Sequence, residues 1–91
     1  MEIKLTKLAF QDLRSIENYI GQDKPTAAKS VINRVMESID NIATFPSIGR
    51  NGRVPYTKEL VVSSTPFIIV YQVRHNTLFI ARIIHAARKW P

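Results

Sequence analysis

The chain has 91 residues, of which 45% are hydrophobic and 22% are charged, and it contains no cysteine. This composition is typical of a folded globular domain and excludes a disordered chain. The lack of cysteine excludes disulfides, thiolate metal sites and thiol catalysis. No apolar run reaches the roughly 18 residues of a membrane span, so we expect a soluble cytoplasmic protein that makes no membrane contact.

The charge is divided unequally between the two halves of the chain. From residue 50 onward, seven lysines and arginines face a single carboxylate, Glu59, whereas the first 49 residues hold six cations and six anions. The whole net charge of +6 therefore belongs to the second half, where we expect an acidic or polyanionic partner to bind. The only histidines are His75 and His85, and no carboxylates have ligand spacing, so we expect neither a metal nor a cofactor.

The first half predicts a strand and two helices. Apolar and charged residues alternate in residues 2–6, as in a strand with one apolar face. Apolar residues then recur at steps of three and four in residues 7–20 and again in residues 25–45, which predicts two amphipathic helices. Gly21 is a natural stop for the first helix, and Pro46 ends the second. Because the joint is short, we expect the helices to pack as an antiparallel hairpin.

The second half predicts a loop and a sheet. Residues 46–57 hold two glycines and two prolines and are expected to form a loop. Apolar runs at residues 58–63, 67–74 and 78–85 predict strands joined by hairpins, and residues 86–91 form a tail. The chain is too short for a second core, so residues 1–91 are expected to form one domain. We expect an α+β fold, in which the N-terminal strand and the helix hairpin pack on an antiparallel sheet of three to four strands.

The last two predicted strands are apolar at almost every position, with Gln72 and Arg82 as interruptions. Both faces of such a sheet need cover. The helix hairpin can cover one face. Either the tail and the long loop or a separate protein would cover the other, because a monomer seldom exposes a large apolar patch.

Three motifs give the chain a family resemblance. They are Phe45-Pro46-Ser-Ile-Gly49-Arg50, Pro66-Phe-Ile-Ile-Val-Tyr-Gln-Val73 and Arg82-Ile-Ile-His85-Ala-Ala-Arg88. Together with the order of the elements, they resemble the RelE/ParE superfamily of toxins from bacterial toxin–antitoxin modules, over essentially the whole chain. The resemblance implies the RelE/ParE toxin fold. It also implies a small basic toxin that a cognate antitoxin neutralises in a hetero-oligomeric complex.

The superfamily divides by target. RelE-like members cleave messenger RNA on the ribosome, without a metal, using two arginines that would fall at Ile68 and Ala86 of this chain. Aliphatic side chains can neither stabilise phosphate charge nor transfer a proton. ParE-like members trap DNA gyrase without chemistry of their own, and similarly have an aliphatic residue at the strand position and an Arg-x-x-His ending. The resemblance therefore favours a ParE-like gyrase inhibitor that blocks replication. The alternatives are a ribosome-dependent endoribonuclease and a degenerate relative that only binds antitoxin.

The residues expected to contact the target lie in the predicted loop and near the end of the chain. They are Arg50, Arg53, Arg82, His85, Arg88, Lys89 and Trp90. Arg88 and Lys89 suit phosphates, and Trp90 either stacks on a base or folds over the sheet. The loop arginines Arg50 and Arg53 either contact a partner or are simply solvated.

The end of the last strand has a catalytic and a structural interpretation. If the protein cleaves RNA, the catalytic set would be Arg82, His85 and Arg88. Alternatively, His85 fixes the tail by a hydrogen bond, and it points away from Arg82 unless the strand ends or bulges there. Arg82 must contact a target, face solvent or pair with an acid, because an unpaired buried guanidinium is costly. The candidate acids are Asp12, Glu17 and Glu59.

Overall fold

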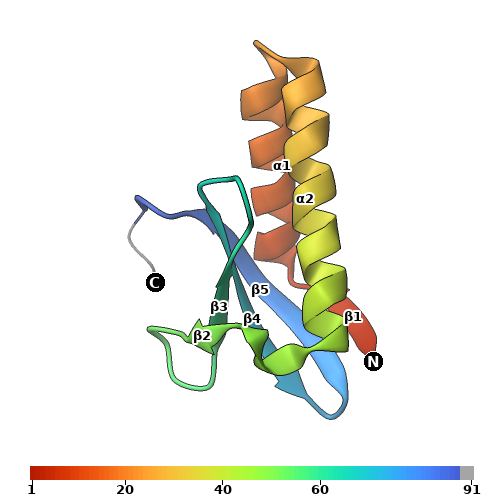
Figure 1. Ribbon diagram of the computed structural model, residues 1–91. Coiled ribbons are helices and arrows are strands. Elements are labelled where there is room, and N and C mark those ends of the chain that lie inside the picture. Colours follow the sequence, from red (N-terminus) through yellow and green to blue (C-terminus); the bar gives the residue numbers. More distant parts are fainter. Residues whose placement is uncertain (89–91) are drawn as a thin grey trace.

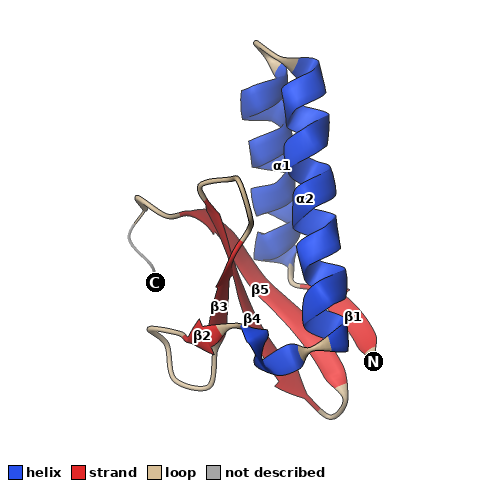
Figure 2. Ribbon diagram, in the orientation of Figure 1, coloured by secondary structure: helices blue, strands red, loops and turns tan. Residues whose placement is uncertain are grey.

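The computed structural model describes residues 1–88, in which a helix hairpin packs on one side of a twisted sheet (Figure 1). In chain order the elements are β1 (Glu2–Leu5), α1 (Lys7–Gly21), α2 (Pro25–Thr44), the short 3₁₀ helix η1 (Pro46–Ile48), β2 (Arg50–Asn51), β3 (Lys58–Val61), β4 (Phe67–Arg74) and β5 (Thr77–His85). Figure 2 shows the two long helices as one layer and the strands as the other. This architecture confirms the predicted α+β fold.

The sheet contains five strands in the order β1-β5-β4-β3-β2. Strands β3, β4 and β5 form an antiparallel meander. The structure differs from the expected three to four antiparallel strands in two details. β1 runs parallel to β5, which is possible because the helix hairpin and the strands β2, β3 and β4 lie between them in the sequence. Arg50 and Asn51 add a further short strand inside the predicted loop, antiparallel to β3.

The start of each helix and the end of α2 have a local physical reason. At the start of α1, Oγ1 of Thr6 accepts a hydrogen bond from Ala9 N–H at 3.1 Å and donates one to the carbonyl of Ala81 on β5 at 2.8 Å. α2 has Pro25 in its first turn, where a missing N–H leaves no bond unmade. It ends at Thr44, shortly before Pro46, which disfavours helical backbone in the residue preceding it.

Both faces of the central strands are buried. The main core lies between the helices and the sheet, and its sheet residues are Ile69, Tyr71, Leu78, Ile80 and Ile83. A second, smaller cluster consists of Ile68, Val70 and Ile84 with Ala81 packed against it, and alternation along β4 places it on the opposite face. The loop between β2 and β3 folds toward that face, because it bonds to Glu59, which lies directly opposite Val70.

The turn after α2 is held by Tyr71 of β4. The buried Tyr71 hydroxyl donates a hydrogen bond to the carbonyl of Pro46 at 2.6 Å and accepts one from Gly49 N–H at 3.0 Å. Burial raises the pKa of the phenol, and the Gly49 bond opposes that shift. A Cβ on Gly49 would lie 2.6 Å from the Tyr71 oxygen and 3.0 Å from the carbonyl of Glu59. The motif therefore needs glycine at position 49.

We expect Gly49→Ala to lower the free energy of unfolding by about 1–3 kcal/mol, because the added methyl overpacks the turn against Tyr71. Urea denaturation measures the change. Gly21→Ala is the matched control, since a Cβ there would lie 3.7 Å from Cβ of Ala28, an ordinary contact. The control should unfold at or above the wild-type midpoint. A Gly49→Ala midpoint equal to that of the wild type would contradict this account of the turn.

Candidate functional site

The described candidate residues form two groups on the sheet. Arg50 and Arg53 lie in β2 and the loop that follows it, and Arg82, His85 and Arg88 lie in the second half of β5 and just beyond. The predictions for Lys89 and Trp90 fall outside the described residues. The β5 group is held by hydrogen bonds to α1 and within the turn that follows β5, and the loop group is held by contacts with Glu59 of β3.

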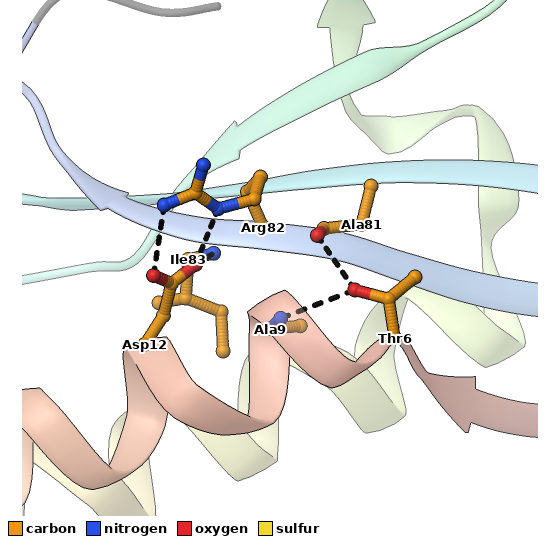
Figure 3. Close-up of polar contacts among 6 residues, drawn as sticks. All are labelled: Thr6, Ala9, Asp12, Ala81, Arg82 and Ile83. Atoms are coloured by element: carbon orange, nitrogen blue, oxygen red, sulfur yellow. Dashed lines mark hydrogen bonds and ion pairs between the residues drawn. The ribbon is translucent and has the colours of Figure 1, made fainter.

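Arg82 is paired with an acid of the first helix (Figure 3). Its guanidinium donates two hydrogen bonds to the Asp12 carboxylate, from Nε to Oδ2 at 2.7 Å and from the terminal nitrogen to Oδ1 at 2.9 Å. Asp12 also accepts the backbone N–H of Ile83 at 3.0 Å. The bonds to Asp12 raise the pKa of Arg82 above its usual range. Among the three candidate acids, Asp12 is therefore the hydrogen-bonded partner, and Arg82 is committed to holding α1 against β5.

The register of β5 keeps Arg82 and His85 apart. Arg82 lies opposite Val70, and His85 lies opposite Phe67. The irregularity in the pairing of β4 with β5 falls between Val70 and Tyr71, and therefore before Arg82 along β5. The two side chains are therefore three positions apart on a regular strand segment, on opposite faces. A bulge between Arg82 and His85 could have turned both side chains to the same face, but the irregularity lies outside that segment.

His85 organises the turn that follows β5. Its Nδ1 accepts a hydrogen bond from Ala87 N–H at 3.1 Å, and its carbonyl accepts one from Arg88 N–H at 2.9 Å. Its ring stands edge-on to Phe67, with centroids 5.6 Å apart. This geometry is that of a histidine that fixes the chain at a strand end, while the exposed Arg88 side chain is carried on the ordered turn.

The loop that carries Arg50 and Arg53 closes around a buried carboxylate. Glu59 is only 4% exposed. It lies 3.5 Å from the guanidinium of Arg50 and accepts the backbone N–H of Arg53 at 3.0 Å. The Arg50 side chain is nevertheless 64% exposed, so it still presents its charge to solvent. The sequence signal for this arrangement was present, because Glu59 is the one carboxylate in the basic half.

Two apolar hollows lie on the helix side of the molecule and were not predicted from the sequence. The first, of about 500 Å³, is lined by Ser15, Ile16, Tyr19, Ile20, Val31, Ser64, Thr65, Pro66, Phe67 and His85. The second, of about 350 Å³, is lined by Leu5, Phe10, Leu13, Arg14, Glu17, Ile32 and Met36. Both are built from the helix hairpin and adjoining ends of strands, so their linings come together only in the fold.

Comparison with known proteins gives a consistent result. The family model for the ParE toxin of type II toxin-antitoxin system, parDE, matches residues 3–90. Y4kP of Sinorhizobium fredii, described as a toxin, is 37% identical over 89 residues, which cover 98% of this chain and 92% of that relative. Toxin RelE2 of Caulobacter vibrioides is 38% identical over 87 residues, which cover 96% of this chain and 97% of the relative.

Solved structures share the fold. A chain of the chromosomal ParDE toxin–antitoxin system from P. aeruginosa superposes with a TM-score of 0.84 at 24% identity, covering 93% of this chain and 95% of that one. A chain of the intact E. coli RelBE toxin–antitoxin complex gives a TM-score of 0.71 at 15% identity, covering 96% and 98%. The helix hairpin on its sheet is thus the RelE/ParE toxin fold. The chain belongs to the ParE toxin family of type II toxin–antitoxin systems.

Within residues 1–88, neither α1 nor α2 has the length and apolar character that crossing a membrane requires.

We expect Asp12→Ala to lower the free energy of unfolding by about 3 kcal/mol, because it removes the carboxylate from Arg82 and the acceptor from Ile83 N–H. Glu17→Ala is the matched control, since Glu17 is an exposed acid of the same helix and its loss should change stability by at most about 0.5 kcal/mol. Chemical denaturation of both variants gives the comparison. An equally small effect of Asp12→Ala would show that the pair does not anchor α1.

Proposed function

We propose that this toxin inhibits DNA gyrase and blocks replication in the cytoplasm, without catalysing a reaction itself. The observation that carries the proposal is the aliphatic character of positions 68 and 86. Ile68 is buried in the second apolar cluster, and Ala86 lies in the turn after β5, where its N–H is bonded to the carbonyl of Pro66 at 2.8 Å. Neither side chain can offer a cation to a phosphate. Membership of the ParE family supports the same interpretation.

The geometry of the remaining candidates also favours an inhibitor. Arg82 uses its guanidinium to hold Asp12. His85 lies on the other face of β5, and its Nδ1 accepts the Ala87 N–H. A nuclease that works without metal needs cations and a proton-transferring group around one phosphate. In the described part of the chain, Arg82 and His85 are not placed to share one.

We further propose that a cognate antitoxin neutralises the toxin in a hetero-oligomeric complex. The two apolar hollows beside the helix hairpin offer sockets for apolar side chains of a protein partner. Large exposed apolar residues lie around them, with Phe10 54% exposed and Tyr19 80% exposed. The net charge of +6 favours an acidic partner. The structural neighbours from the ParDE and RelBE systems support a protein partner of this kind.

A RelE-like ribosome-dependent endoribonuclease is the second candidate function. The observation in its favour is the relative named RelE2, which is 38% identical over nearly the whole chain. In that case the exposed His85 and Arg88 at the end of β5 would supply the chemistry, with Arg82 as the third member of the set.

Two assays with the purified toxin separate these functions. The toxin is added to gyrase with supercoiled plasmid, and in parallel to ribosomes programmed with a messenger RNA. We expect linear DNA that remains bound to gyrase until the protein is denatured, and an intact messenger. Codon-specific cuts in the messenger without trapped DNA would overturn the proposal. Inactivity in both assays, with unimpaired growth of cells that produce the toxin alone, would also overturn it and would identify a degenerate relative.

We expect His85→Gln to retain growth inhibition when the toxin is produced without antitoxin. Glutamine is polar but has no titratable ring, and an inhibitor needs a surface rather than proton transfer. A general acid or base, by contrast, contributes roughly 10²–10⁴-fold to a rate. The matched control is His75→Gln in the turn between β4 and β5. Loss of toxicity in His85→Gln alone, with the far-ultraviolet circular dichroism unchanged, would favour the nuclease.

A further inference from the structure

Tyr56, in the loop between β2 and β3, has a backbone conformation and an exposure that are unusual for a tyrosine. It is 90% exposed, although tyrosine is largely apolar. Its backbone φ of 67° lies in the left-handed region, which costs a residue with a Cβ roughly 1–2 kcal/mol. Glycine or asparagine would adopt this conformation more easily. Strain of this kind is concentrated at functional sites, where the surrounding structure holds it in place.

The loop around Tyr56 is ordered by its own hydrogen bonds. Gly52 N–H donates to the carbonyl of Thr57 at 2.8 Å, and Thr57 donates to the carbonyl of Val54 from its N–H at 3.2 Å and from its hydroxyl at 2.7 Å. The bond from Arg53 N–H to the buried Glu59 ties the loop to the sheet. The aromatic ring is therefore presented on a preorganised loop, which lowers the entropy cost of binding.

The loop that carries Tyr56 is rich in cationic side chains. Arg50, Arg53 and Lys58 flank it along the loop. Between residue 41 and the end of the chain the only carboxylate side chain is Glu59, which is buried beneath the loop. A surface rich in lysine and arginine attracts phosphates or acidic side chains.

The immediate neighbours of the ring favour a nucleobase over an apolar protein side chain. Tyr56 borders a hollow of about 270 Å³, whose lining includes Ser47, Lys58 and Gln72. These groups supply the hydrogen-bond donors and acceptors that a base edge requires. Tyr56 also borders a hollow lined mainly by loop residues, among them Asn51 and Gly52.

We propose that the loop from Arg50 to Lys58 binds single-stranded nucleic acid, with the Tyr56 ring stacked on an unpaired base and the flanking cations on the adjacent phosphates. Proteins that bind single strands without sequence preference generally stack the bases on aromatic side chains and bind the backbone with nearby cationic side chains. The inference rests on the proposed function in one respect only: in the cell, the single strand would belong to the cleaved DNA that gyrase holds. Binding of an isolated strand needs no gyrase.

The test is fluorescence anisotropy of a labelled single-stranded DNA of about 12 nucleotides, within the usual site sizes of such binders, titrated with full-length toxin at low salt. We expect Tyr56→Ala to weaken binding by about 5- to 150-fold, the range found for removing one aromatic stacking partner, and Tyr56→Phe to retain it. Tyr56→Gly should fold at least as well as the wild type, because it relieves the left-handed strain, and should still lose binding. Leu8→Ala, which removes a large exposed apolar side chain from α1, should bind normally.

Two sets of outcomes separate this inference from the proposed function. Equal affinity of the wild type, Tyr56→Ala and Tyr56→Gly, or no binding of the oligonucleotide by the wild type, would overturn the inference. If gyrase trapping depends on Tyr56 although the toxin binds no oligonucleotide, the loop contacts protein and only the proposed function survives. If Tyr56-dependent binding is found without gyrase trapping, the inference stands and the proposed function fails.

Discussion

The second part of β5, which has no strand on the side where β1 pairs with the first part, is the constraint on which the rest of the structure depends. β1 pairs with only the first part of β5, so the following backbone groups have no strand beside them. The first turns of α1 replace the missing strand: Thr6 bonds to the carbonyl of Ala81, and the Asp12 carboxylate accepts Ile83 N–H (Figure 3). Because an unmade buried hydrogen bond costs about 1–3 kcal/mol, these contacts fix the position of the helix hairpin.

The same contacts decide which cations the molecule offers to a partner. Asp12 comes from the half of the chain in which charges balance, and it engages Arg82 from the basic half. Glu59, the one carboxylate of the basic half, is turned inward and orders the loop that carries Arg50. Asp12 and Glu59 therefore both stabilise the fold through their contacts within the chain. Arg50 of the loop and Arg88 after β5 are exposed and present their charge at the surface.

Features that depend on local periodicity were predictable from the sequence, and features that depend on register were not. The apolar stripes of the two helices and the glycine and proline signals at their ends placed both helices within a residue or so of their observed bounds. The parallel pairing of β1 and the two-residue strand β2 leave no periodic signal. The sequence named Asp12 as one of three possible partners of Arg82, because choosing among them requires the tertiary packing of α1 on β5. Tyr56 was missed because its exposure and backbone conformation exist only in the folded loop.

The brevity of the outermost strands bears on how the molecule behaves at high concentration. β2 has two residues and β1 has four, and β1 bears the opposite charges Glu2 and Lys4 side by side, 3.8 Å apart. A long, flat and apolar border would act as a template on which further copies could add end to end into aggregates. The long apolar strands β4 and β5 lie in the interior of the sheet, between the shorter strands β1 and β3. A basic protein with such apolar central strands can therefore stay dispersed while its borders remain too short to recruit copies of itself.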